Sequence, residues 1–120
     1  MHPHVAAIDV QPITRLFRAL GDETRVRIIA LLTHGELCVC HLEAALGLSQ
    51  PNVSRQLGVL RSAGIVAPRR EGNWIYYRIA KQTDEECRRV LRAIKLLAAE
   101  ETLRQDVARL REVRGPGSCR

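Results

Sequence analysis

The first part of the chain carries apolar residues at the three- and four-residue spacing typical of amphipathic helices. From Pro12 this spacing predicts a first helix, which Gly21 ends. Its apolar face holds Ile13, Leu16, Phe17 and Leu20. Asp22 is a favourable N-cap for a second helix, which we expect to end at His34 and Gly35. The inward positions of that helix are Val26, Ile29, Leu31 and Leu32.

The segment from Glu36 to Arg61 has the pattern of two helices joined by a tight turn. The first helix is expected from about Cys38 to Leu46, followed by Gly47 at a position where positive φ is common. Ser49 fits the N-cap of the second helix, and Pro51 fits its first turn. The inward stripe of the second helix is Val53, Leu57 and Leu60. This arrangement predicts a helix-turn-helix.

The polar face of the second helix favours DNA as its partner. Amide, hydroxyl and guanidinium groups pair with base edges and phosphates in the major groove. Residues 49–62 contain no Asp or Glu that would repel phosphate. An ordinary amphipathic helix with a solvated polar side is the competing interpretation. The candidate DNA-binding residues on this helix are Ser49, Gln50, Asn52, Ser54 and Arg55.

Residues 65–69 and 74–79 are predicted to form two strands around a turn at residues 70–73. Val, Ile, Trp and Tyr favour strands, and Gly72-Asn73 favours the turn. Three residues at the tip, Arg69, Arg70 and Asn73, are expected to reach phosphates or the minor groove. A solvated basic turn is the competing interpretation. Together the elements predict a mainly α fold with a small β-hairpin, a winged helix-turn-helix.

A long helical stretch from Thr83 to about Val113 predicts a homodimer through the terminal helices. The winged unit is too small to cover its broad apolar face, so a partner subunit is expected, with Phe17 and Leu20 joining the interface. A two-fold dimer would place two recognition helices about one DNA turn apart. Packing within one chain is the other possibility. The apolar positions are Val90, Leu91, Ile94, Leu97, Leu103, Val107 and Leu110.

We expect four regions in the 120 residues: a flexible arm at 1–11, the winged domain at 12–82, the dimerisation helix at 83–113 and a flexible tail at 114–120.

The composition of the chain indicates its binding partner and its cellular compartment. The net charge of +6 and the pI of about 9.8 fit a polyanion partner. No apolar run reaches the ~20 residues of a membrane span, and no signal peptide opens the chain. The expected location is therefore the cytoplasm.

Cys38 and Cys40 are candidate ligands of a soft, thiophilic ion. Amide dipoles at a helix start favour the thiolate form. A disulfide between thiols one residue apart is strained, so a ligand site is the better interpretation. On an ideal helix residues i and i+2 point about 200° apart. We therefore expect ligand binding to unwind or distort the first turn of the helix that begins near Cys38.

Three segments resemble the ArsR/SmtB family of metal-responsive repressors: LFRALGDETRVRII, ELCVCHLEAALGLSQPNVSRQLGVLRSAGIV and REGNWIYYRI. ELCVC is similar to the arsenic-responsive members in particular. The resemblance covers about residues 13–79. It implies a homodimeric repressor that releases double-stranded operator DNA when the thiolates matching Cys38 and Cys40 bind arsenite or antimonite. It implies no resident cofactor.

The chain departs from the arsenic-responsive pattern in its third ligand. That pattern reads Cys-Val-Cys-Asp-Leu-Cys, whereas Glu43 stands here at the third cysteine position. Trivalent arsenic favours three sulfurs, so Cys119 is the candidate third ligand, within or across the dimer, and Cys87 is the second choice. Relatives that sense cadmium or lead add cysteines to the N-terminal arm, where this chain has only His2 and His4.

Other functions compete with the metalloid sensor. A divalent soft-metal sensor for cadmium or lead, and a repressor with Cys38 and Cys40 as a redox switch, would keep the same fold. A constitutive DNA-binding protein with incidental cysteines is a further possibility. A thiol enzyme is not expected, because no cysteine opens the Cys-x₅-Arg motif of a phosphate-cradling loop.

Overall fold

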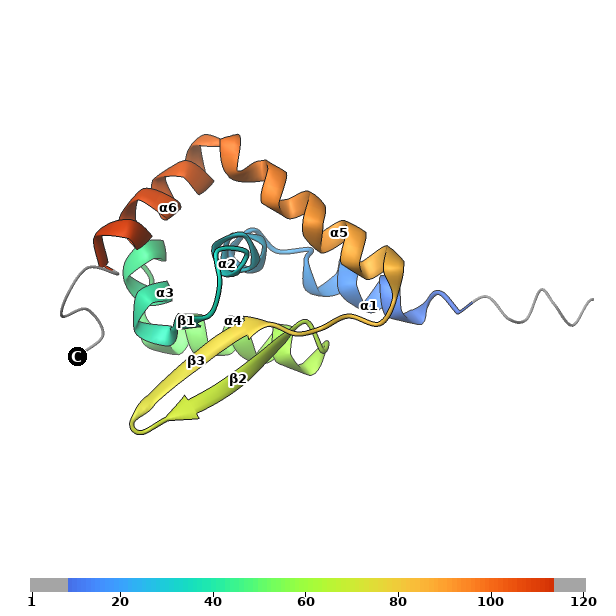
Figure 1. Cartoon of the computed structure of the whole chain (residues 1–120), viewed down its shortest axis with the longest axis horizontal. Helices are drawn as coiled ribbons and strands as arrows, with labels where there is room; N and C mark the ends of the chain where they lie inside the picture. Colours follow the sequence, from blue (N-terminus) through green and yellow to red (C-terminus); the bar gives the residue numbers. More distant parts are fainter. Residues whose placement is uncertain (1–8, 114–120) are drawn as a thin grey trace, which may run out of the picture.

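The computed structural model describes residues 9–113 and confirms the predicted winged helix-turn-helix (Figure 1). The three strands form one antiparallel sheet in the order β1-β3-β2. None of the helices within the described residues is long and apolar enough to cross a membrane. In chain order the elements are α1 Gln11–Ala19, α2 Glu23–Leu32, β1 Leu37–Cys38, α3 Val39–Leu46, α4 Gln50–Ser62, β2 Val66–Glu71, β3 Trp74–Ile79, α5 Glu85–Lys95, the 3₁₀ helix η2 Leu96–Ala99 and α6 Glu101–Val113.

The helix boundaries follow the capping residues. The Asp22 carboxylate accepts a hydrogen bond from the Arg25 backbone N–H at 3.1 Å, which satisfies one free donor at the start of α2. Ser49 Oγ accepts one from the Asn52 backbone N–H at 3.4 Å in the same way at the start of α4. Gly47 ends α3 with φ +68°, a conformation that glycine adopts without strain. These signals in the sequence therefore define the helix-turn-helix.

The hairpin is longer than the sequence pattern predicted. Arg70 and Glu71 lie inside β2 and pair with Ile75 and Trp74, so only Gly72 and Asn73 form the turn. Gly72 has φ +60°, as tight two-residue hairpin turns require. The sequence pattern did not predict β1, whose two residues pair with Tyr77 and Tyr76 of β3. This pairing joins the wing to the segment that carries Cys38.

The hydrophobic core surrounds α2. Its residues Ile28, Ile29 and Leu31 are completely buried. The arch formed by α5 and α6 passes over α2, while α3, α4 and the sheet lie on its other side (Figure 1). Buried leucines of α3 and α4 complete the core on the inner side of the helix-turn-helix: Leu42, Leu46, Leu57 and Leu60. The helix-turn-helix therefore packs directly on the hydrophobic core.

The C-terminal stretch is two α-helices joined by the 3₁₀ helix η2, whereas the sequence pattern predicted one helix. Glu100 has extended dihedral angles and separates η2 from α6. Beyond it α6 turns back along α3 and α2 of the same chain and buries Leu103 and Leu110 there (Figure 1). Packing within one chain, the competing possibility for this stretch, therefore describes α6. The expected N-terminal arm up to residue 8 and the expected tail at 114–120 lie outside the described residues.

Candidate DNA-binding surface and thiol site

The predicted DNA-binding residues of α4 gather at its N-terminal half. Gln50 Nε2 donates to Ser54 Oγ at 2.5 Å, and Arg55 Nη2 donates to Asn52 Oδ1 at 3.2 Å. All of these side chains except Asn52 are exposed, as is the N-cap Ser49. The helix start therefore presents amide, hydroxyl and guanidinium groups together, and these groups can pair with base edges or phosphates.

The wing residues fall into two environments. Arg70 and Asn73 are exposed at the end of the hairpin. Arg69 instead donates to the Glu36 carboxylate, with its closest N–O distance at 2.6 Å, and to Glu71 at 3.2 Å. The hydrogen bonds from Arg69 lower the pKa of Glu36. The structure thus separates Arg69 from the two other residues of the predicted tip.

The two cysteines Cys38 and Cys40 lie where β1 meets α3. Cys38 is the last residue of β1 and the N-cap of α3, with extended angles of φ −69° and ψ 148°. Cys40 lies in the first turn of the helix. The two Sγ atoms are 3.0 Å apart. The premise that both cysteines lie on the first turn of the helix was wrong, because Cys38 stands outside it, and the expected unwinding or distortion on ligand binding stays a prediction.

This position connects the thiols to both DNA-binding elements. Cys38 pairs with Tyr76 of β3, which is a strand of the wing. Cys40 belongs to α3, which packs against the recognition helix α4. The Cys38 side chain is 2% exposed and that of Cys40 is half-buried. A ligand held by both sulfurs would therefore act on the wing and on the helix-turn-helix at once.

The third ligand is not found among the described residues. Within residues 9–113 no group of three His, Cys, Asp or Glu side chains is placed to hold a metal ion. Cys87 is buried on α5, where it lines a cavity of about 500 Å³ together with Ile13 of α1. Burial raises the pKa of the Cys87 thiol, which disfavours the thiolate that a ligand site needs. Cys119 lies outside the described residues.

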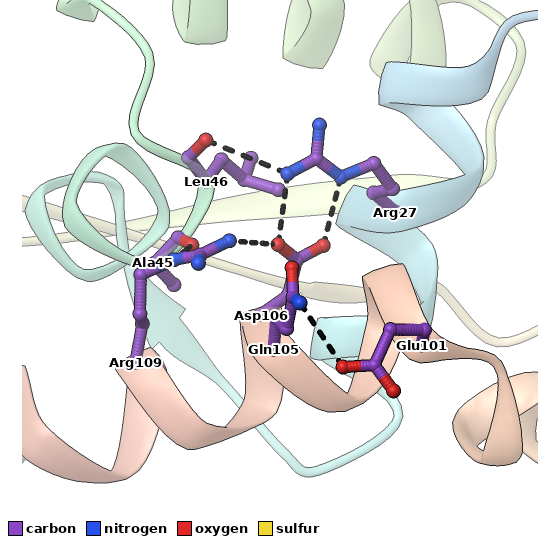
Figure 2. A network of polar contacts seen from close by, with 7 residues as sticks. All are labelled: Arg27, Ala45, Leu46, Glu101, Gln105, Asp106 and Arg109. Carbon is purple, nitrogen blue, oxygen red and sulfur yellow. Dashed lines mark hydrogen bonds and ion pairs between the residues drawn. The ribbon is translucent and has the colours of Figure 1, made fainter.

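A buried ion-pair network that the sequence analysis did not predict holds the other end of α3 (Figure 2). Asp106 of α6 is fully buried and accepts two hydrogen bonds from Arg27 of α2, both at 2.8 Å. Arg109 donates to the same carboxylate at 2.6 Å. The two arginines also donate to the last carbonyls of α3, Arg109 to Ala45 at 2.6 Å and Arg27 to Leu46 at 3.5 Å.

The network stabilises the C-terminal end of α3. Guanidinium groups at a helix C-terminus satisfy free carbonyls and complement the helix dipole. The hydrogen bond to Asp106 raises the pKa of Arg27. One signal for the network was present in the sequence, since the spacing of Leu103, Asp106 and Leu110 puts a carboxylate on an apolar helix face. α3 is therefore fixed at its C-terminal end, and the thiols lie at the opposite end.

Known proteins with similar sequences are regulators of transcription. The family described as "Bacterial regulatory protein, arsR family" matches residues 22–67. The chain is 42% identical over 111 residues to the arsenic resistance transcriptional regulator ArsR1 of Pseudomonas putida, covering 92% of this chain and 84% of that protein. It is 49% identical over 67 residues to the arsenical resistance operon repressor of Escherichia coli, covering 55% of this chain and 57% of that protein.

Solved structures give the same assignment. The homodimeric winged helix-turn-helix DNA-binding domain of a Mycobacterium bovis protein superposes with a TM-score of 0.64 and 33% identity, covering 84% of this chain and 90% of that one. Reduced HlyU from Vibrio cholerae superposes with a TM-score of 0.62 and 31% identity, covering 72% and 85%. The fold and the relatives are those of DNA-binding regulators and not of enzymes. The chain therefore belongs to the ArsR family of transcriptional repressors.

Proposed function

We propose that this repressor binds operator DNA as a homodimer in the cytoplasm and releases it when trivalent arsenic or antimony binds the thiolates of Cys38 and Cys40. One observation carries the proposal: the two sulfurs lie 3.0 Å apart at the junction between the wing and the helix-turn-helix. Soft metalloid ions prefer thiolate ligands. The two relatives named for arsenic resistance support this choice of inducer.

The DNA part of the proposal rests on the exposed start of α4 and the end of the wing. Gln50, Asn52 and Arg55 would pair with base edges in the major groove, while Ser49 and Ser54 would bind the adjacent phosphates. Arg70 and Asn73 would hold the backbone beside the groove. The net charge of +6 favours the approach of DNA.

The ligand part needs a third donor. Cys119 is the proposed one, either from the same subunit or from its partner. Cys87 is the weaker choice because it is buried on another helix and its raised pKa keeps it a thiol. To act as an inducer, the ion must bind the released form more tightly by roughly 1–3 kcal/mol.

Fluorescence anisotropy tests the proposal directly. The full chain is titrated onto a labelled duplex taken from upstream of its own gene, with and without arsenite. We expect arsenite to weaken binding at least fivefold, and Cys38→Ser or Cys40→Ser to abolish the effect. Cys87→Ala is the matched control and should still respond.

The competing functions give different results in the same assay. Release by cadmium alone would move the assignment to a divalent-metal sensor. Release by diamide alone, reversed by a reductant, would make the pair a redox switch. An operator affinity that none of these agents changes would mean that the thiol pair has no regulatory role.

A further inference from the structure

The Arg69 side chain is exposed, but its guanidinium is fully engaged in contacts with other residues of the protein. Its Nε and Nη2 atoms bind the Glu36 carboxylate at 2.6 to 3.1 Å, and Nη1 donates to Glu71 Oε2 at 3.2 Å. Its Cζ atom also lies 4.8 Å from the centre of the Tyr76 ring, a distance at which cation and ring attract each other. Every nitrogen of the side chain therefore has a partner.

These contacts cross the whole sheet. Arg69 of β2 is the direct register partner of Tyr76 in β3, and Tyr76 is in turn the partner of Cys38 in β1. Directly opposed residues of antiparallel strands share one face of a sheet. Arg69, Tyr76 and Cys38 thus form one row across the three strands. Glu36 lies directly before β1, and its carboxylate accepts the hydrogen bonds of Arg69 at 2.6 to 3.1 Å.

The same contacts disfavour a phosphate at Arg69. A phosphate would have to replace Glu36 and Glu71, and both carboxylates would repel it. Arg70 differs, because it is exposed and no hydrogen bond or ion pair of its side chain occurs among residues 9–113. The two neighbouring arginines therefore have different tasks.

We propose that Arg69 is a positioning residue, which ties the wing to the strand carrying Cys38, and that Arg70 is the arginine of the wing that binds DNA phosphate. The regulatory half of this inference rests on the proposed metalloid function. According to this regulatory half, a ligand bound to Cys38 moves the wing through the Glu36–Arg69 ion pair and through the strand pairing of Cys38 with Tyr76. The phosphate half is independent of any inducer.

The experiment compares Arg69→Gln with the matched control Arg70→Gln. The first readout is the salt dependence of operator affinity without arsenite. Loss of one phosphate contact lowers the slope of log K against log salt by about 0.9. Because the proposed homodimer carries Arg70 twice, we expect a decrease of about 1.8 for Arg70→Gln and an unchanged slope for Arg69→Gln. A decrease of the same size for Arg69→Gln would overturn the assignment.

The second readout is the ratio of operator affinities without and with arsenite. We expect Arg69→Gln to lower this ratio roughly two- to fivefold, because an exposed ion pair contributes only a small free energy. Arg70→Gln should leave the ratio unchanged. Glu36→Gln should reproduce the Arg69→Gln effect, and the double variant should lose no more than either single one. Equal ratios in wild type and Arg69→Gln would refute the regulatory half.

The proposed inducer and the proposed role of Arg69 can be refuted independently of each other. If arsenite does not release the wild-type protein, the proposed inducer is wrong and the salt slopes alone decide the role of Arg69. Thermal unfolding of each variant gives a further control, because an exposed ion pair contributes little to stability. A Tm for Arg69→Gln within about 2 °C of wild type would support a positioning role over a structural one.

Discussion

A single carboxylate, Asp106, joins three helices of the protein. It is fully buried, and it holds Arg27 of α2 and Arg109 of α6 while both arginines reach the end of α3 (Figure 2). A buried charge of this kind stabilises the fold only while its partners remain. The network therefore gives α3 a fixed end against which a change at the thiols can act.

Asp106→Asn should lower the free energy of unfolding by about 2–3 kcal/mol, because two guanidinium groups lose their shared anion in a buried site. Arg104→Gln is the matched control, since its pair with Glu101 on the same helix is more than half exposed. That change should cost at most about 0.5 kcal/mol. Urea unfolding followed by circular dichroism measures both, and equal effects would contradict the role given to Asp106.

Cys87 should behave as an inert thiol. Burial raises its pKa, so the neutral form is favoured in the folded state. Its contribution to stability is complete below the thiol's unfolded pKa and is lost as the pH rises through the folded value. We expect iodoacetamide to modify Cys87 at pH 8 only in urea. The modified peptide is identified by its absence in the Cys87→Ala variant. Rapid modification of the native protein would show that the thiol is accessible.

At the scale of elements, α3 depends on both of its ends. Gly47 closes the helix in a left-handed conformation, and Cys38 opens it from a strand. A helix of eight residues is too short to be stable on its own, so it depends on packing against its neighbours. Its place between sheet and recognition helix comes from its caps and its neighbours.

Gly47→Ala should destabilise the protein by about 1 kcal/mol, because an L side chain at φ +68° is strained. An added Cβ meets no atom within 4 Å there, so the cost is conformational and not steric. Gly58→Ala is the matched control in α4, where the Cβ also has open space and the backbone is helical. It should stabilise by about 0.5 kcal/mol. Urea midpoints that move in the same direction would contradict this account.

Local signals predicted most of the elements but not their tertiary relations. Asp22, Gly47 and Ser49 define helix ends through their own backbone and side chains, and the sequence pattern predicted these ends correctly. The strand character of Cys38 depends on pairing with Tyr76, which lies far away in the sequence. The return of α6 likewise depends on burial against α3. Such non-local contacts decide the geometry of the thiol site, so the sequence analysis misplaced Cys38 in a helix.

At the scale of the whole molecule, the proposed homodimer has a candidate surface on α1 and at the end of α5. Phe17 of α1 is 56% exposed and Leu96 after α5 is 81% exposed. α1 and α5 contact each other and form one side of the molecule (Figure 1). Large apolar side chains that are exposed in this way favour association.

Phe17→Glu should convert the dimer into a monomer, because it would put a charge into an apolar interface. Trp74→Glu is the matched aromatic control on the wing, where the side chain is 37% exposed. It should leave the sedimentation coefficient of the dimer unchanged. Analytical ultracentrifugation distinguishes the two states, and a dimeric Phe17→Glu variant would exclude Phe17 from the interface.

If the cysteine pair and the DNA-binding surface are energetically coupled, arsenite and operator DNA must each weaken the binding of the other. Arsenite affinity is measured by calorimetry on the free repressor and on the repressor saturated with operator DNA. Linkage requires DNA to weaken arsenite binding by the same factor by which arsenite weakens DNA binding. We predict that operator DNA lowers the affinity for arsenite at least fivefold. Cys38→Ser should abolish arsenite binding and therefore this effect as well. Equal arsenite affinities with and without operator would contradict the account.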